Sequence, residues 1–346
     1  MKDKKNIRLL SFEEIKKFFL EHNEKAFRAK QVYEWIWKKH VSSFEEMRNI
    51  SKAIINLLNE HFFLDKIKIF KEQKSSDGTI KVSFKLSDNE IIEGVLIPTT
   101  NRVTACISTQ VGCSLSCAFC ATGKIGFARN LTSIEIFDQV AILTKLSEEN
   151  YGQPLSNIVY MGMGEPLLNY QNVIQSVEKI TSETGMAMSP YRITISTVGI
   201  SKMIKKLGDD KVKFNLALSL HAATDSKRRS IMPVNEYNSI STLIEALKYF
   251  YQKTKTRITI EYLLLHNFND NLDDAKELCR FCRNFPVKIN LIEYNEVENS
   301  GFKKSGEQKT LEFVDYLESK NLIVNLRRSR GKDIDAACGQ LANKDK

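Results

Sequence analysis

Three cysteines within eight residues, Cys113, Cys117 and Cys120, constrain this chain more than any other feature of its sequence. They follow a strand-like run at residues 103–109 and precede a glycine-punctuated loop at residues 121–126. Thiolate sulfur is the ligand that soft metals and iron–sulfur clusters prefer. A loop that curls so that its three sulfurs converge therefore predicts a metal centre.

The number of cysteines indicates which kind of centre this is. Structural zinc normally takes four ligands in a closed site, usually as two pairs set well apart on the chain. Here there are three, and a cubane cluster held by three cysteines leaves one iron open to an outside ligand. We therefore expect one [4Fe-4S] cluster. A zinc site or three unrelated buried thiols are the alternatives that the spacing alone leaves open.

The cysteine loop resembles the cluster loop of the radical S-adenosylmethionine (SAM) superfamily. This resemblance implies that the amino and carboxylate groups of SAM chelate the fourth iron. The segment Gly-Met-Gly-Glu-Pro at residues 162–166 resembles the superfamily's motif for the SAM amine, at Gly164 and Glu165. The residue types suit that role, because glycine lets the backbone approach a ligand and a carboxylate can hold an ammonium group.

From residue 103 onward, strand patterns alternate with helical patterns, which predicts a parallel sheet in an α/β fold. The candidate strands are residues 103–109, 157–161, 192–196, 213–218, 257–264 and 288–292, with a last strand at 322–326 after a helix near 310–319. Polar residues and glycines follow the carboxyl ends of these strands, as they do in the active site of a βα barrel. Six such units predict a partial (β/α)6 radical SAM barrel, open on one side.

The residues before this barrel predict two smaller units. Ser-Phe-Glu-Glu capping boxes at residues 11–14 and 43–46 each precede apolar residues at helical spacing, and both tryptophans of this helical region are expected in its core. Residues 79–86 and 91–98 alternate as the two strands of a hairpin. We expect four segments: a helical domain suited to docking at 1–75, a bridging β-hairpin at 76–100, the core barrel at 101–333 and a C-terminal tail that contains a cysteine at 334–346.

The distribution of charge favours a polyanionic partner. The chain has a formal net charge of +9, and residues 1–75 carry 17 Lys and Arg against 11 Asp and Glu. Two thirds of the net charge thus lies in the first fifth of the chain. Such an excess is typical of a module that holds nucleic-acid backbone, although a solvated helical surface would also carry it.

The C-terminal tail completes a more specific pattern. It contains Cys338 beside glycine in Asp-Ile-Asp-Ala-Ala-Cys-Gly-Gln-Leu. Together with the cluster loop, Met-Gly-Met-Gly-Glu-Pro and Ser-Leu-His, it closely resembles the RlmN/Cfr family of adenine methyltransferases over essentially the whole chain. The resemblance implies SAM contacts, beyond Gly164 and Glu165, at Ser196, Ser219, Leu220, His221 and Asn295. Taken singly, each is as well explained as a strand-end hydrogen-bonding residue, and His221 is also a candidate general acid or base.

The family resemblance also implies a mechanism that consumes two SAM molecules per turnover. Adenine C2 is electrophilic, so it cannot attack a methyl sulfonium as a nucleophile. In this family one SAM methylates Cys338, and a second gives a radical that takes hydrogen from that methyl group. The methylene radical adds to the base, and Cys106 then attacks Cys338, which leaves a transient disulfide. Glu93 aligns with the proposed proton acceptor, although an ordinary strand carboxylate would look the same.

The expected substrates are 23S rRNA and some tRNAs, with the target adenosine exposed in a loop or extruded from its stack. We expect an electron donor such as flavodoxin or ferredoxin, a monomeric chain and no membrane. The N-terminus resembles no signal peptide, and seven cysteines without an export signal indicate a reducing cytoplasm. Cys279 and Cys282 lie in a helical pattern, so we expect them to pack in the core instead of binding metal.

Two further readings of the chain remain open at this point. One is the Cfr-type enzyme, which modifies C8 of adenine and confers antibiotic resistance on the ribosome; Glu93-Gly-Val-Leu-Ile-Pro98 and Pro166 look more like the C2 enzymes. The other is a zinc-stabilised RNA-binding protein without catalysis, which would contain zinc in place of iron and sulfide.

Overall fold

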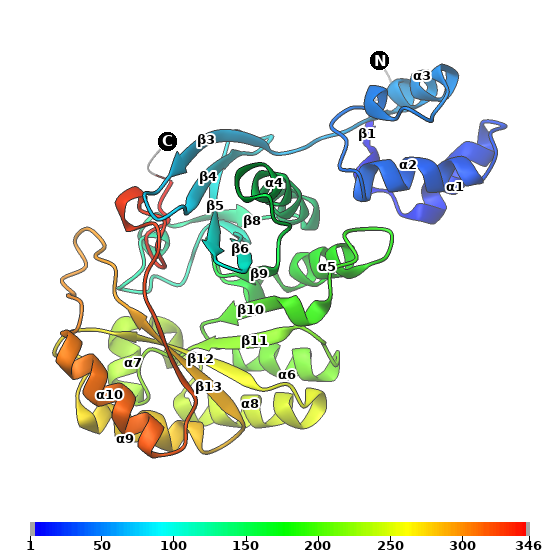
Figure 1. Cartoon of the computed structure of the whole chain (residues 1–346). Coiled ribbons are helices and arrows are strands. Elements are labelled where there is room, and N and C mark those ends of the chain that lie inside the picture. The colour runs from blue at the N-terminus through cyan, green and yellow to red at the C-terminus, as the bar shows by residue number, and fades with distance from the viewer. Residues whose placement is uncertain (1–3, 344–346) are drawn as a thin grey trace.

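One ten-stranded sheet organises the molecule in the computed structural model, which describes residues 4–343 (Figure 1). Seven of its strands run parallel and curve into a barrel with helices outside. In sheet order they are β6 (Arg102–Cys106), β9 (Asn157–Tyr160), β10 (Ile193–Thr197), β11 (Asn215–Ser219), β12 (Ile258–Leu264), β13 (Val287–Glu293) and β14 (Val324–Arg327). The order is linear and β14 is an edge strand, so the barrel is open, as the sequence predicts.

Helices cover the outer face of the parallel strands. They are α4 (Ser133–Tyr151), α5 (Tyr170–Thr181), α6 (Ser201–Asp209), α7 (Asp225–Ile231), α8 (Ile240–Thr254), α9 (Leu272–Cys282) and α10 (Glu307–Ser319). Strands such as β12 are buried along their whole length, because helices and the barrel interior enclose both faces. Cys279 and Cys282 lie buried in the core, which confirms that they pack.

The sheet continues beyond β6 as three antiparallel strands, β5 (Ile91–Thr99), β4 (Ile80–Lys85) and β3 (Lys68–Lys74). The β4–β5 pair is the predicted hairpin, and β5 pairs with β6, so the hairpin belongs to the sheet of the core. β3 lies outside the strands that the sequence pattern predicts. A small second sheet, β7 (Gln110–Gly112) with β8 (Phe127–Asn130), brackets the cysteine loop.

The N-terminal module consists of α1 (Phe12–Glu21), α2 (Phe27–Trp37) and α3 (Lys52–His61), with β1 (Lys5–Asn6) paired to β2 (Phe62–Phe63). The first capping box begins α1 as predicted, since Ser11 and Glu14 bond reciprocally. The second box also forms, since Glu46 accepts from the Ser43 N–H, but the helix predicted to follow it is wrong there: residues 44–46 form one 3-10 turn, and Ser51 caps α3. Trp37 is buried as expected, whereas Trp35 is half-buried.

A buried ion pair joins this module to the barrel. The Arg8 guanidinium donates two hydrogen bonds, of 2.5 and 2.7 Å, to the Asp138 carboxylate on α4. Beside it, the Trp37 ring meets Phe137 edge-on at 5.2 Å between centroids. The remaining short elements are 3-10 helices at Ile7–Leu9, Phe44–Glu46, Thr122–Lys124, Pro166–Asn169, Pro190–Arg192, Pro233–Glu236 and Lys332–Ile334. Within residues 4–343, none of the helices has the length and apolar character that crossing a membrane requires.

Candidate active site

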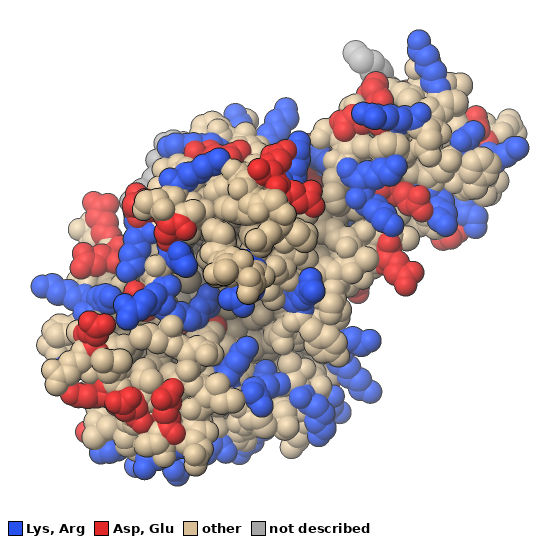
Figure 2. Space-filling model, in the orientation of Figure 1, with Lys and Arg blue, Asp and Glu red and all other residues tan. Residues whose placement is uncertain are grey.

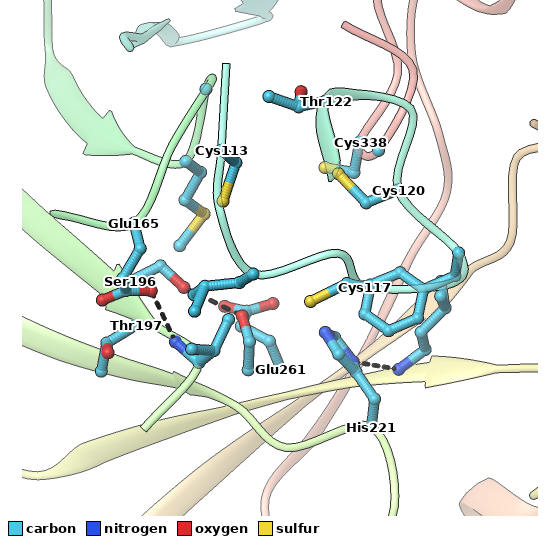
Figure 3. A pocket seen from close by; sticks show the side chains of 18 of the residues that line it. Cys113, Cys117, Cys120, Thr122, Glu165, Ser196, Thr197, His221, Glu261 and Cys338 are labelled. Carbon is cyan, nitrogen blue, oxygen red and sulfur yellow. Dashed lines mark hydrogen bonds between the residues drawn. The ribbon is translucent and has the colours of Figure 1, made fainter. Parts of the chain in front are cut away.

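The cysteine loop leaves the barrel where two backbone segments touch. Gly112 has a φ of +75°, and a Cβ there would lie 1.9 Å from the Gly126 carbonyl oxygen, so only glycine fits. The Cys113 N–H donates to that same oxygen at 2.7 Å. Residues 113–126 therefore form a closed loop over the carboxyl ends of the strands, and their cysteines line the central cavity (Figure 3).

The three thiols of this loop differ in exposure but face one cavity. Cys117 is buried, and Cys113 and Cys120 are half-buried. Burial raises the pKa of Cys113 to about 11 and raises the pKa of Cys117 further. In the described residues no group of three His, Cys, Asp or Glu side chains is arranged to hold a single metal ion. Three cysteine thiols that line one cavity are the donor set that iron–sulfur centres take.

The Gly-Met-Gly-Glu segment places a carboxylate on the cavity wall. Gly164 has a φ of +94°, and a Cβ there would lie 2.4 Å from Cβ of Gln110. Glu165 then turns inward, where its oxygens accept from the N–H groups of Leu167, at 3.0 Å, and Val198, at 2.9 Å. Burial raises the pKa of Glu165 to about 7. A ligand ammonium group would supply the positive charge that the carboxylate lacks in this enclosed position.

Two neighbouring strands contribute the next predicted residues. Ser196 on β10 and Ser219 on β11 lie 3.1 Å apart through their hydroxyl oxygens and both line the cavity. His221 also lines it, but Nδ1 accepts from the Leu263 N–H at 3.0 Å and burial lowers the pKa of the ring to about 3. A ring that stays neutral at physiological pH is poorly suited to act as a proton donor. The Leu220 side chain is fully buried and does not line the cavity.

Asn295 connects the cavity region to the C-terminal tail. Its amide nitrogen donates to the Cys338 carbonyl oxygen at 3.3 Å. Its amide oxygen is buried and has no hydrogen-bond partner among the described residues. Buried polar atoms are nearly always paired, so this oxygen has the capacity for one more hydrogen bond. Asn295 itself lines neither cavity, so the structure does not bring it to the cavity wall with the two serines.

The two other predicted cysteines come from distant parts of the chain and line the same second cavity. Cys106 ends β6, and Cys338 lies in the tail; both line this second cavity, and both are free thiols. Cys338 also lines the first cavity, so its side chain is exposed to internal space although it lies deep in the protein. Burial raises the pKa of both thiols, that of Cys106 to about 12.

Glu93 lies behind the tail instead of on either cavity wall. It is 1% exposed and pairs with Lys81 at 3.5 Å. Its Oε2 accepts from the backbone N–H groups of Ala342, at 2.9 Å, and Asn343, at 3.3 Å. In this conformation the carboxylate fixes the tail, and it reaches a substrate only after the tail moves.

Sequence reasoning missed two charged residues at the site. Arg327 ends β14 and lines both cavities, and its guanidinium lies 3.7 Å from the Glu261 carboxylate on β12. Burial opposes ionisation of Arg327, but the charges of Glu261, Cys338 and Cys106 raise its pKa. A charged residue inside the otherwise apolar run of β12 was the signal that could have revealed Glu261.

Comparisons with known proteins identify the family of the chain. Residues 5–64 match the family model "Ribosomal RNA large subunit methyltransferase N-terminal domain", and residues 107–282 match "Radical SAM superfamily". The chain is 55% identical to the "Probable dual-specificity RNA methyltransferase RlmN" of Cytophaga hutchinsonii, over 99% of this chain and 94% of that protein.

A second relative and a solved structure extend the likeness to the whole fold. The "Dual-specificity RNA methyltransferase RlmN" of Oleidesulfovibrio alaskensis is 43% identical over 96% of this chain and 94% of its own length. The crystal structure of a radical SAM methyltransferase from Sphaerobacter thermophilus superposes with a TM-score of 0.92 at 35% identity, covering 97% of this chain and 98% of that one.

Proposed function

This chain belongs to the RlmN family of radical SAM RNA methyltransferases, and we propose that it places a methyl group on C2 of an adenosine in 23S rRNA and in some tRNAs. One observation carries the proposal: Cys338 stands on the wall between two cavities. A residue that takes a methyl group from a cofactor and passes its carbon to a base must face both, and Cys338 does.

The residues around the first cavity fit the cofactors of a radical SAM enzyme. Cys113, Cys117 and Cys120 would hold the [4Fe-4S] cluster, and SAM would contact Gly164, Glu165, Ser196, Ser219 and Asn295. Leu220 can contribute only backbone atoms, and His221 contributes a neutral ring. When bound, the cluster and SAM supply the 5′-deoxyadenosyl radical that removes one hydrogen from the cysteine-bound methyl group.

Two cysteines of the chain carry the carbon transfer. The Cys338 thiolate would attack the methyl carbon of one SAM, so that a thioether S–C bond forms as the sulfonium S–C bond breaks and S-adenosylhomocysteine leaves. Once that carbon is joined to adenine C2, the radical adduct would return one electron to the cluster and lose the C2 proton, for which Glu93 is our candidate acceptor. The Cys106 thiolate then attacks the Cys338 sulfur, so that an S–S bond forms as the S–C bond breaks. The electron pair of the broken bond stays on the methylene carbon, which takes up a proton to become the methyl group. An external reductant returns the disulfide to two thiols.

We base the proposed partners, cellular location and oligomeric state of the enzyme on the same family membership. We propose that the N-terminal module docks RNA, that flavodoxin or ferredoxin supplies electrons, and that the enzyme acts as a cytoplasmic monomer. The four-part division of the chain at residues 75, 100 and 333 remains our working description of how these tasks are shared.

Isotope labelling tests the proposed reaction. Anaerobic incubation with an RNA substrate and methyl-deuterated SAM is expected to deliver two deuteriums per product methyl group, because one is lost as hydrogen is removed. Mass-spectrometric mapping of the product nucleoside separates C2 from C8 modification. Cys338→Ala is expected to abolish methylation, whereas Cys282→Ala, in α9, is expected to retain it. Transfer of all three deuteriums would overturn the proposal.

A further inference from the structure

The second cavity differs in chemistry from the first. Beyond the wall that it shares with the first cavity, it has an apolar floor and a rim made by the end of β14 and the residues that follow. The floor includes Val95, Ile97, Ala336 and Leu341, none of which lines the first cavity, and the rim is formed by residues 327–330, Arg-Arg-Ser-Arg. An apolar floor suits the face of a base, and arginines suit phosphate oxygens.

The backbone of the rim is fixed although its side chains reach solvent. The Ser329 N–H donates to Glu293 at 3.4 Å, and the Gly331 N–H donates to Asp77 at 2.9 Å. The side chains of Arg327, Arg328 and Arg330 are 39%, 69% and 46% exposed. The guanidinium groups are therefore displayed from an ordered segment, which limits the entropy that a ligand must remove.

These arginines are held only loosely by protein carboxylates. Their nearest ion pairs are 3.7 Å to Glu261, 3.5 Å to Glu307 and 4.0 Å to Asp77. Charge-assisted bonds are normally 2.7–2.9 Å long. The same chain makes such bonds elsewhere, for Arg129 reaches Asp88 at 2.6 Å and Glu135 at 2.8 Å. The rim arginines thus have donors to offer an anion.

The face around the rim is basic as well. Figure 2 shows a band of Lys and Arg side chains crossing the molecule at the level where the C-terminal segment, red in Figure 1, passes in front of the barrel. Lys332, in the same segment, pairs with Glu293 at 3.2 Å. A polyanion that approaches this face meets the rim arginines before it reaches Cys106 or Cys338.

We propose that Arg327, Arg328 and Arg330 form a clamp for the RNA phosphates that flank the target adenosine, and that the second cavity receives its base. This rests on the proposed function, because it takes RNA as the substrate. The clamp fixes the nucleotide's backbone at the rim, so that the base lies over the apolar floor with C2 toward Cys338. It contributes affinity without reading sequence, as phosphate contacts do.

Equilibrium binding tests the clamp without any catalysis. The cluster-loaded protein is titrated with a fluorescently labelled RNA hairpin that carries the target adenosine in its loop, at several salt concentrations. Arg328→Gln and Arg330→Gln are each expected to weaken binding about tenfold at low salt, the loss of one charge-assisted bond. Each is also expected to reduce the slope of log K against log salt by about 0.7. Arg280→Gln is the matched control, since Arg280 is also 69% exposed but pairs with Glu277 at 2.5 Å on α9.

A second reporter separates the clamp from a general charge effect. With 2-aminopurine at the target position, binding to the wild-type protein is expected to change the fluorescence as the base leaves its stack, and Arg327→Gln is expected to diminish that change. Equal salt slopes for the two rim variants and the Arg280→Gln control would overturn the clamp. Neither measurement requires methyl transfer. If the wild-type protein bound RNA in this way but did not methylate it, the proposed reaction would be overturned and the clamp would stand.

Discussion

At the scale of single residues, one wall of the first cavity depends on a glycine, Gly164. Gly164→Ala would put a Cβ 2.4 Å from the Gln110 side chain at a φ of +94°. Gln110 cannot withdraw freely, because its Oε1 accepts from the Glu165 N–H at 2.8 Å. We expect the free energy of unfolding to fall by about 3 kcal/mol or more, the sum of overpacking and backbone strain. Weaker SAM binding, measured by calorimetry, should accompany the loss.

Gly126 provides the matched control for this substitution. It also has a positive φ, +78°, but a Cβ there would meet no atom within 4 Å. Gly126→Ala should therefore cost only the backbone term, about 1–2 kcal/mol. Chemical denaturation of both variants measures the difference. Equal losses would show that the contact with Gln110 is relieved without cost.

A second residue-scale prediction concerns Glu93 and the tail. Glu93→Ala removes the acceptor of two backbone N–H groups, so hydrogen exchange at residues 334–343 should accelerate by about tenfold or more. Glu93→Gln keeps an oxygen acceptor and should retain most of the protection. Exchange in β10 reports global stability and serves as the internal control. Unchanged exchange of the tail in Glu93→Ala would contradict the view that this carboxylate holds it.

At the scale of elements, the stability of the contact between the N-terminal module and the barrel should depend on pH through His40. Its half-buried ring lies 5.4 Å from Phe137, and burial, Lys66 and Arg8 lower its pKa to about 4, opposed by Asp138. In the folded state the His40 ring stays neutral down to about pH 4, whereas in the unfolded state it takes up a proton below about pH 6.5. The ring's contribution to stability is thus complete above pH 6.5 and is lost as pH falls toward 4.

Comparison with His40→Asn isolates this dependence. Asparagine tolerates the φ of +54° at this position and does not titrate. Between pH 6.5 and 4 the wild-type protein should lose about 1–2 kcal/mol more unfolding free energy than the variant, a value discounted for partial exposure. Denaturant unfolding monitored by tryptophan fluorescence measures it. Parallel curves for the two proteins would assign the pH dependence to other groups.

Elements with a strong periodic signal were predictable, and those set by tertiary contact were not. The parallel strands bury both faces and end in polar turns, so their positions could be predicted to within a few residues. By contrast, β3 is an exposed, lysine-rich edge strand that has no apolar alternation to reveal it. The second capping box forms but begins no α-helix, because such a box fixes only one turn and the chain leaves helical geometry at Met47.

The same distinction applies to the site. Cysteine and glycine motifs are local in sequence, so the cluster loop and the Gly-Met-Gly-Glu segment could be identified from it. The position of Glu93 behind the tail depends on contacts between residues about 250 positions apart. Arg327 lies at the site only because the end of β14 reaches both cavities, and no local sequence pattern indicates that position.

At the scale of the whole molecule, two basic regions stand apart on one chain: the N-terminal module and the rim of the second cavity (Figures 1 and 2). On the module, Lys39 lies over the Trp35 ring at 3.7 Å, and Arg48 lines the same hollow. If one RNA spans both regions, binding is bivalent, and the rigid Arg8–Asp138 joint fixes their separation. Binding at one region then strengthens binding at the other only when the RNA is long enough to reach both.

This predicts a length-dependent response to charge removal. Lys39→Gln with Arg48→Gln should weaken binding of a folded tRNA by about tenfold or more, yet leave a short oligonucleotide around the target adenosine nearly unaffected. Arg328→Gln with Arg330→Gln should weaken both ligands, because the rim meets the target itself. Fluorescence anisotropy at two salt concentrations measures all four combinations. If the module variant weakened the short oligonucleotide as strongly as the tRNA, the two regions would be acting as one diffuse positive field, and the module would have no docking role of its own.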